Sequence, residues 1–355
     1  MMYPFRKCLP VILVACFAAG ARADDILTYV GAIDVGRPLG RIVADPVRSK
    51  VYGITGTGDV VFIDRGTMSV ENVVSTGRVL RDIDMHPSNN YVTVLDNVTG
   101  HYWNQPPQVY VIDFDLQTQT PSNIVFANAP LFQMAHGREN RIVGIRTNQW
   151  VSAYQLNATT GERLSSVGAG YYGSTSWEDP NLFVTNSTGT RLYRTDVGIS
   201  QIDLKVFDIS TDTISGMPGR AGVGSYGNEP VFLNSTDTSL YVGDLRVNPD
   251  NVSQTLGVFP EHILAATGDD AFAFGVSGVY DPVWGSRLQD VPAGSRMMAL
   301  GEQERYLYTF DRNTQQLHVM SVVPEPSTLV ALLSLTLTGL TIYGCRRRKR
   351  LVEGR

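Results

Sequence analysis

The chain of 355 residues contains only three cysteines, and none of them lies in its long middle part. Cys8 and Cys16 fall within the first 23 residues, and Cys345 lies ten residues from the end. Residues 24–323 therefore contain no disulfide bond, no cysteine-ligated zinc site and no thiol nucleophile.

Positive charge is also scarce in this middle part, where Lys50 and Lys205 are the only lysines. Of the 29 basic residues, three precede residue 24 and six follow residue 344. Of the 34 acidic residues, only Glu325 and Glu353 lie outside residues 24–323. This leaves 20 basic and 32 acidic side chains, a net charge of −12. Such a surface repels phosphate backbones, so nucleic acid is not expected as a partner.

The sequence lacks the spacings typical of common catalytic sites. Its five histidines form no His-x-His or His-Glu-x-x-His pattern, and we predict that they, His136 among them, are surface or turn residues. No Gly-x-Ser-x-Gly or phosphate-binding glycine loop occurs. We therefore predict no catalytic residue, no metal ligand and no cofactor. Calcium is the open alternative, because acidic pairs such as Asp113 and Asp115 alternate along one strand. Aspartates in turns that bond their own backbone explain most of these pairs.

The N-terminus has the parts of a secretory signal peptide. Arg6 and Lys7 precede an apolar run from Cys8 to Gly20, and a small-x-small site ends at Ala23. We expect residues 1–23 to be removed after Ala23. The alternative is a lipoprotein signal in which Cys16 is lipidated, because Leu13-Val14-Ala15-Cys16 fits a lipobox.

The C-terminus combines three elements over residues 323–355. The residues Pro324, Glu325 and Pro326 precede an apolar run from Leu329 to Gly344. A basic cluster follows, made of Arg346, Arg347, Arg348, Lys349 and Arg350. The apolar run predicts a single transmembrane helix, with the basic cluster on the cytoplasmic side and the body outside.

This tail resembles the PEP-CTERM sorting signal of Gram-negative bacteria that make extracellular polysaccharide. The resemblance covers only about thirty residues and implies an exosortase-type processing enzyme as a partner. It also implies a protein that is secreted across the inner membrane, anchored by its tail and then placed at the cell surface or outside the cell. A role in biofilm or exopolysaccharide would fit these expectations. The plain alternative is an ordinary membrane anchor with a proline linker.

The body, residues 24–322, alternates apolar and polar residues in short runs separated by Gly, Asn, Asp and Pro, which is typical of an all-β protein. A polar turn followed by a second strand recurs seven times, with a mean spacing in the low forties, the size of a four-stranded propeller blade. These units are residues 44–52, 85–92, 135–143, 177–184, 234–242, 266–274 and 300–308.

Third strands follow in several units, as in residues 60–64, 109–113 and 204–208, whereas the fifth and sixth units lack a clear one. We predict a seven-bladed β-propeller in which residues 26–36 supply the last strand of the seventh blade. The pattern is similar to the YVTN and WD40-like propeller repeats. A pair of β-sandwich domains is the alternative.

Two long insertions, residues 96–108 and 171–199, are the predicted ligand-binding loops, because loops on a rigid scaffold concentrate binding residues. Their aromatic residues Tyr102, Trp103, Tyr172 and Trp177 suit sugar rings or protein surfaces. The first hypothesis is therefore a binding or structural module for polysaccharide or surface proteins. The alternative is a metal-dependent, lactonase-like propeller hydrolase, whose channel ligands would come from distant blades and leave no local motif.

Overall fold

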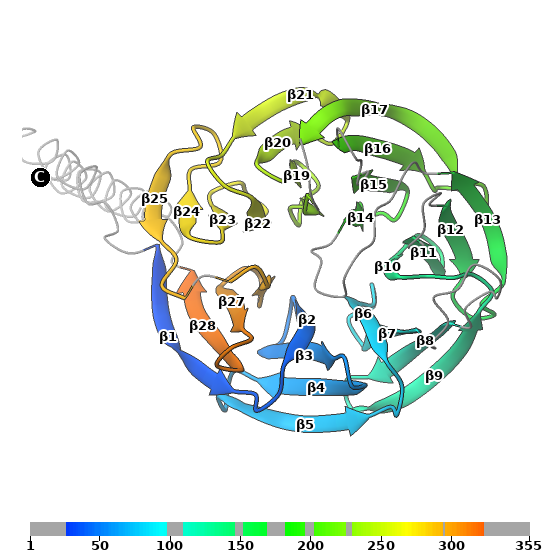
Figure 1. Ribbon diagram of the computed structural model, residues 1–355, viewed down its shortest axis with the longest axis horizontal. Coiled ribbons are helices and arrows are strands. Elements are labelled where there is room, and N and C mark those ends of the chain that lie inside the picture. Colours follow the sequence, from blue (N-terminus) through cyan, green and yellow to red (C-terminus); the bar gives the residue numbers. More distant parts are fainter. Residues whose placement is uncertain are drawn as a thin grey trace, which may run out of the picture. The chain divides into compact units, whose positions relative to one another are not determined.

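The computed structural model describes residues 26–97, 109–145, 152–168, 182–195, 202–224, 229–293 and 295–322. The secondary structure of these residues consists of strands only. The strands form seven separate antiparallel sheets of four strands each. The sheets are arranged as blades around a central axis (Figure 1). The predicted seven-bladed propeller is confirmed, and the alternative of two sandwich domains is excluded.

The innermost strand of each blade lies next to the axis (Figure 1). In chain order these strands are β2 (Leu39–Ala44), β6 (Leu80–Met85), β10 (Gln133–His136), β14 (Phe183–Thr185), β18 (Val231–Leu233), β22 (Ile263–Ala266) and β26 (Met298–Gly301).

The second strands of the blades are rich in buried apolar and aromatic residues. They are β3 (Lys50–Thr55), β7 (Tyr91–Asn97), β11 (Arg141–Ile145), β15 (Arg191–Thr195), β19 (Leu240–Val242), β23 (Ala273–Gly275) and β27 (Tyr306–Asp311).

The third strands include two short ones in the fifth and sixth blades, which explains why the sequence pattern is weak there. They are β4 (Asp59–Asp64), β8 (Val109–Asp115), β12 (Ser152–Asn157), β16 (Ile202–Asp208), β20 (Leu245–Asn248), β24 (Gly278–Tyr280) and β28 (Gln316–Val322).

The outermost strands run along the perimeter (Figure 1). Six of them follow the third strand of their own blade, and the seventh comes from the N-terminal end of the described chain. They are β5 (Ser69–Ser75), β9 (Thr120–Ala127), β13 (Arg163–Gly168), β17 (Ser215–Gly224), β21 (Asn251–Val258), β25 (Arg287–Asp290) and β1 (Leu27–Asp34).

The seventh blade has the strand order β1-β28-β27-β26, so the predicted closure by residues 26–36 is confirmed. Ile33 and Val35 are almost fully buried. They share one hydrophobic cluster with side chains of the seventh blade, such as Phe310, and of the first blade, such as Val61. The N-terminal strand therefore completes one blade and fills its junction with the next.

One repeat was assigned to the wrong strand. The segment 177–184 was predicted as a turn and second strand, but Phe183–Thr185 is β14, the innermost strand of the fourth blade. Its turn is Asn186–Thr190, where Asn186 accepts hydrogen bonds from the N–H groups of Thr190 and Arg191. An Asn turn followed by Arg191-Leu192-Tyr193 has the same character as the other repeats, and the apolar Leu182-Phe183-Val184 obscured it.

Because successive strands are antiparallel, the connections emerge alternately at two faces. We call the face with the turns between the first and second strands, and between the third and fourth strands, the turn face. The opposite face carries the connections between the second and third strands and between blades, and we call it the loop face.

Candidate functional site

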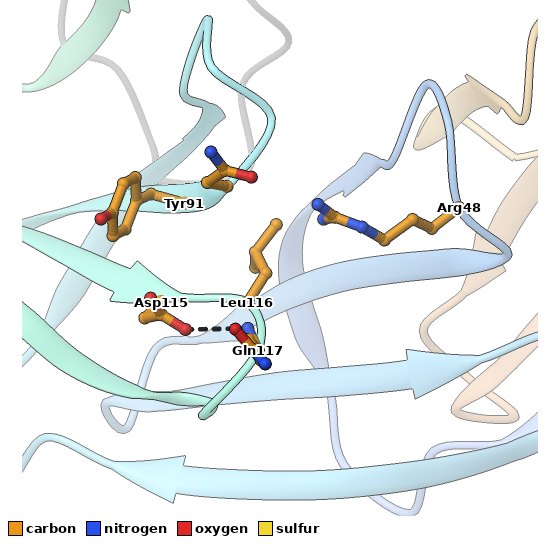
Figure 2. Close-up of a pocket in the computed structure, with 6 residues that line it drawn as sticks. Arg48, Tyr91, Asp115, Leu116 and Gln117 are labelled. Carbon is orange, nitrogen blue, oxygen red and sulfur yellow. Dashed lines mark hydrogen bonds between the residues drawn. The ribbon is translucent and has the colours of Figure 1, made fainter.

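A cleft of about 530 Å³ opens between the first and second blades on the turn face. It has the volume of a small-ligand site. Arg48 reaches from the first blade toward Leu116, and Tyr91 and Asp115 lie on the second-blade side (Figure 2). The full lining is Arg48, Asn90, Tyr91, Asp115, Leu116 and Gln117.

The first-blade wall is held by Asp45, whose side chain is completely buried. Its carboxylate accepts hydrogen bonds from the N–H groups of Val47 and Arg48, at 2.8 and 2.9 Å, and from the Tyr52 hydroxyl at 3.0 Å. Burial and the adjacent Asp45 carboxylate raise the pKa of Tyr52, so the phenol stays protonated and keeps donating. The turn that presents Arg48 is therefore rigid.

Arg48 links the two walls. Its guanidinium donates to the Asp45 carboxylate at 3.0 Å and to the backbone carbonyl of Asn89 at 2.7 Å. Asn89 lies in the turn between β6 and β7 with a φ of 55°. The side chain of Arg48 still exposes 40% of its surface, so it is accessible from the cleft.

The second-blade wall is shaped by an aspartate turn after β8. Oδ1 of Asp115 accepts the N–H groups of Gln117 and Thr118, both at 2.8 Å. These two hydrogen bonds, with that from Thr118 the larger effect, lower the pKa of Asp115, so the group is a carboxylate at neutral pH. Asp113 instead accepts bonds from Thr93 and Asn123. The turn role predicted for most of these aspartates is confirmed for Asp115.

A row of rings leads from the cleft toward the axis. The rings of Tyr91 and His86 lie 5.6 Å apart, and those of His86 and His136 lie 4.8 Å apart, both edge to face. Nε2 of His136 lies 3.0 Å from the Thr93 hydroxyl, which donates to Asp113 at 2.7 Å. Thr93 therefore accepts from His136, whose Nε2 carries the proton.

His136 was predicted to be a surface or turn histidine, and this prediction is wrong. It ends β10, is 9% exposed, and locks the third blade to the second. Burial, with a smaller effect of His86, lowers the pKa of His136 to about 3. The imidazole is therefore neutral at physiological pH.

Beside His136, the innermost strand β6 carries two carboxylates. Asp82 accepts the N–H of Met134 at 2.7 Å, and Asp84 accepts the N–H of His136 at 3.2 Å. Loss of solvent, and secondly the charge of Asp82, raise the pKa of Asp84 to about 7. These carboxylates hold strand β10 of the third blade against the second.

A histidine paired with a glutamate lies on the loop face. Nε2 of His262 is 3.0 Å from the nearly buried carboxylate of Glu229, which raises the pKa of His262. An added Cβ at Gly243 would lie 2.1 Å from this carboxylate, so the glycine leaves room for it. Within the described ranges, no group of three His, Cys, Asp or Glu side chains is placed to hold a metal ion.

The predicted ligand-binding loop 171–199 is wrong in its second half, because β14 and β15 of the fourth blade lie within it. The single residues predicted from sequence as sites all lie outside the described residues. This applies to the ligand-loop residues Tyr102, Trp103, Tyr172 and Trp177, to Pro324, Glu325 and Pro326, and to the basic cluster 346–350. The predicted transmembrane segment 329–344 also lies outside them. In the part of the chain that is described, no helix is long and apolar enough to span a membrane.

The sequence interpretation did not identify the cleft residues as a site, although two signals were available. Arg48, Asn90 and Tyr91 fall in the recurring turn segments 44–52 and 85–92, and Asp115 follows the third strand predicted at residues 109–113. Each was assigned to the repeat, but their meeting across two blades follows only from the packing of the first blade against the second.

Comparisons with known proteins support the fold and no more. No protein-family model matches the chain, and the search of curated proteins finds no match. A chain of hydrazine synthase from Kuenenia stuttgartiensis is similar with a TM-score of 0.61 and 12% identity, over 81% of this chain and 97% of that chain. The β-propeller domain of Cps50 (Swd1) from Myceliophteria thermophila has a TM-score of 0.61 and 13% identity, over 84% and 100%. These likenesses show a propeller body.

The raised pKa of Asp84 predicts a measurable pH dependence of stability. Between its unfolded pKa near 3.8 and its folded pKa of about 7, the native state binds the proton more tightly, so stability falls as pH rises. Asp84→Asn keeps an oxygen for the His136 N–H but removes the charge. At pH 8 we expect the unfolding free energy of the variant to exceed that of the wild type. At pH 5 this difference should be smaller. The gain should grow by on the order of 1 kcal/mol per pH unit in between.

Urea unfolding at pH 5, 6, 7 and 8 measures this difference. Asp115→Asn is the matched control, since hydrogen bonds from backbone N–H groups to the Asp115 carboxylate lower its pKa. The control should lose stability at pH 8. If Asp84→Asn is less stable than the wild type at pH 8, the ionised carboxylate stabilises the fold, and the prediction is contradicted.

Proposed function

We propose that this protein is a carbohydrate-binding module that acts outside the cell, and that the cleft between the first and second blades holds a sugar unit of a polysaccharide. The observation that carries the proposal is the lining of the cleft. It combines one aromatic ring with two amides, a carboxylate and a guanidinium around a single leucine.

This lining matches the chemistry of a pyranose. Sugar hydroxyls both donate and accept hydrogen bonds, and the amides of Asn90 and Gln117 do the same. Asp115 uses Oδ1 for its own turn, and its Oδ2 accepts no hydrogen bond from the described residues, so it is free to accept from a hydroxyl. The ring of Tyr91 offers an apolar face to the C–H face of a sugar.

Rigidity supports binding of a flexible polymer. Arg48 is fixed by Asp45 and Asn89, and the Asp115 turn is fixed by two backbone hydrogen bonds. A site whose side chains are already ordered loses little conformational entropy when ligand binds.

We further propose the route to the cell exterior that the two chain ends indicate. The signal peptide 1–23 would direct export, and the tail 323–355 would anchor the protein until an exosortase-type enzyme removes it. The order Pro324-Glu325-Pro326, apolar segment, basic cluster supports this proposal. The partner polysaccharide would then be extracellular, as in a biofilm matrix.

Tyr91→Ala is expected to weaken polysaccharide binding about tenfold or more, a loss of roughly 1.4 kcal/mol, because it removes the one ring among the described residues that line the cleft. Affinity electrophoresis in gels containing the extracellular polysaccharide of the producing organism measures the change. Tyr29→Ala is the matched control, since Tyr29 is 46% exposed on β1. Equal mobility shifts for the wild type and Tyr91→Ala, with both folded, would place binding elsewhere.

Export and processing have a separate readout. Protein recovered from the cell surface or the medium should begin at Asp24 and lack residues 346–350, as measured by intact mass spectrometry. Surface protein that still carries the complete basic cluster would contradict processing at the tail, and an N-terminal lipid on Cys16 would establish the lipoprotein alternative.

A further inference from the structure

Arg81 stands at an irregular point of the innermost strand β6. Leu80 pairs with Asp96 and Asp82 pairs with Leu95, so Arg81 between them has no register partner and forms a β-bulge. Bulges turn a side chain away from the regular alternation of a strand and occur next to binding sites. Leu80 and Asp82 are buried, and Arg81 itself is only partly exposed.

No carboxylate among the described residues pairs with Arg81. The carboxylates on strands β6 and β7 have other partners. Asp82 lies 3.2 Å from Nε of Arg41, Asp84 accepts the N–H of His136 at 3.2 Å, and Asp96 lies 2.8 Å from Nη1 of Arg78. Nε of Arg81 is shielded from solvent and makes no hydrogen bond within the described ranges. Cζ of Arg81 lies 5.9 Å from the centroid of the Phe132 ring. Burial alone lowers the pKa of Arg81.

Two other blades show that this bulge does not need a cation. The innermost strands β2 and β22 have the same bulge one residue after their first paired position, and the bulged residues are Gly40 and Leu264. A partly buried charge without a counterion is costly, so an arginine at a position where glycine and leucine suffice indicates a ligand.

We propose that Arg81 is the anchor of an oxyanion-binding subsite on the innermost wall of the second blade. The ligand class is a carboxylate or phosphate group, which the planar guanidinium binds through two parallel hydrogen bonds. The group can come from a uronic acid unit of an acidic polysaccharide or from a free inorganic oxyanion. The subsite is distinct from the cleft on the turn face and does not depend on the function proposed for that cleft.

Thermal unfolding of the full chain at constant ionic strength tests the subsite. The probes are galacturonate, polygalacturonate and inorganic phosphate, each exchanged against chloride. A ligand that binds only the native state raises the Tm with its concentration, and we expect a rise of several degrees for at least one oxyanion. Galacturonate and its polymer together indicate a uronate source, and phosphate alone indicates an inorganic one.

Three variants separate the subsite from general salt effects and from the cleft. Arg81→Leu should melt at a higher temperature than the wild type in chloride, because it removes an uncompensated charge, and should show no rise with any oxyanion. Arg163→Gln, which removes an exposed arginine on β13, should respond as the wild type does, and so should Tyr91→Ala. An unchanged response of Tyr91→Ala would show that the oxyanion does not bind in the cleft.

A folding defect in Arg81→Leu would also abolish the response to oxyanions. Two further measurements distinguish this case, one on the Arg81→Lys variant and one on the NMR signals of the arginine side chains. The lysine variant should bind more weakly than the wild type, and the Nε–H signal of Arg81 should shift on titration with the active probe. Equal Tm values of the wild type in chloride and in every oxyanion would overturn the proposal, and so would an oxyanion response that survives in Arg81→Leu.

Discussion

The pairing of β1 with β28 is the constraint on which the rest of the molecule depends. A blade cannot bury both of its faces alone, so each is stable only between two neighbours. The junction of the seventh and first blades would lack part of its core without Ile33 and Val35, which pack with residues of both blades. Closure from the N-terminal end thus joins the two ends of the body and leaves no blade with an unpaired junction.

On the turn face, turns and blade junctions are held by buried tyrosine hydroxyls that donate hydrogen bonds to carboxylates. Tyr52 bonds to Asp45, Tyr241 of the fifth blade to Asp270 of the sixth, and Tyr308 to Glu302, which also binds Arg65 of the first blade at 2.7 Å. The corresponding position of the second blade holds Thr93, which bonds to His136 of the third. These hydrogen bonds hold the turns in place. The cleft is the gap between two such turns, which face each other.

Sequence periodicity was enough to predict seven blades, their approximate positions and closure by residues 26–36, because strand alternation and turn chemistry are local. The fourth repeat was displaced because Leu182-Phe183-Val184 is as apolar as a second strand. The site was not predictable, since Arg48 and Asp115 are 67 positions apart and meet only across a blade junction. The bulge at Arg81 depends likewise on pairing register, which no local pattern encodes.

The most direct test of closure is the thermal stability of a chain that lacks residues 26–36. The deletion removes the buried side chains of Leu27, Ile33 and Val35. Each contributes roughly 1.5–3 kcal/mol by its burial, a sum comparable to the whole stability of a domain. Aggregation or a large fall in Tm is the result we predict, whereas a chain ending at Val322 should melt like the full chain. An unchanged Tm without residues 26–36 would mean that the ring closes without β1, and would contradict the account.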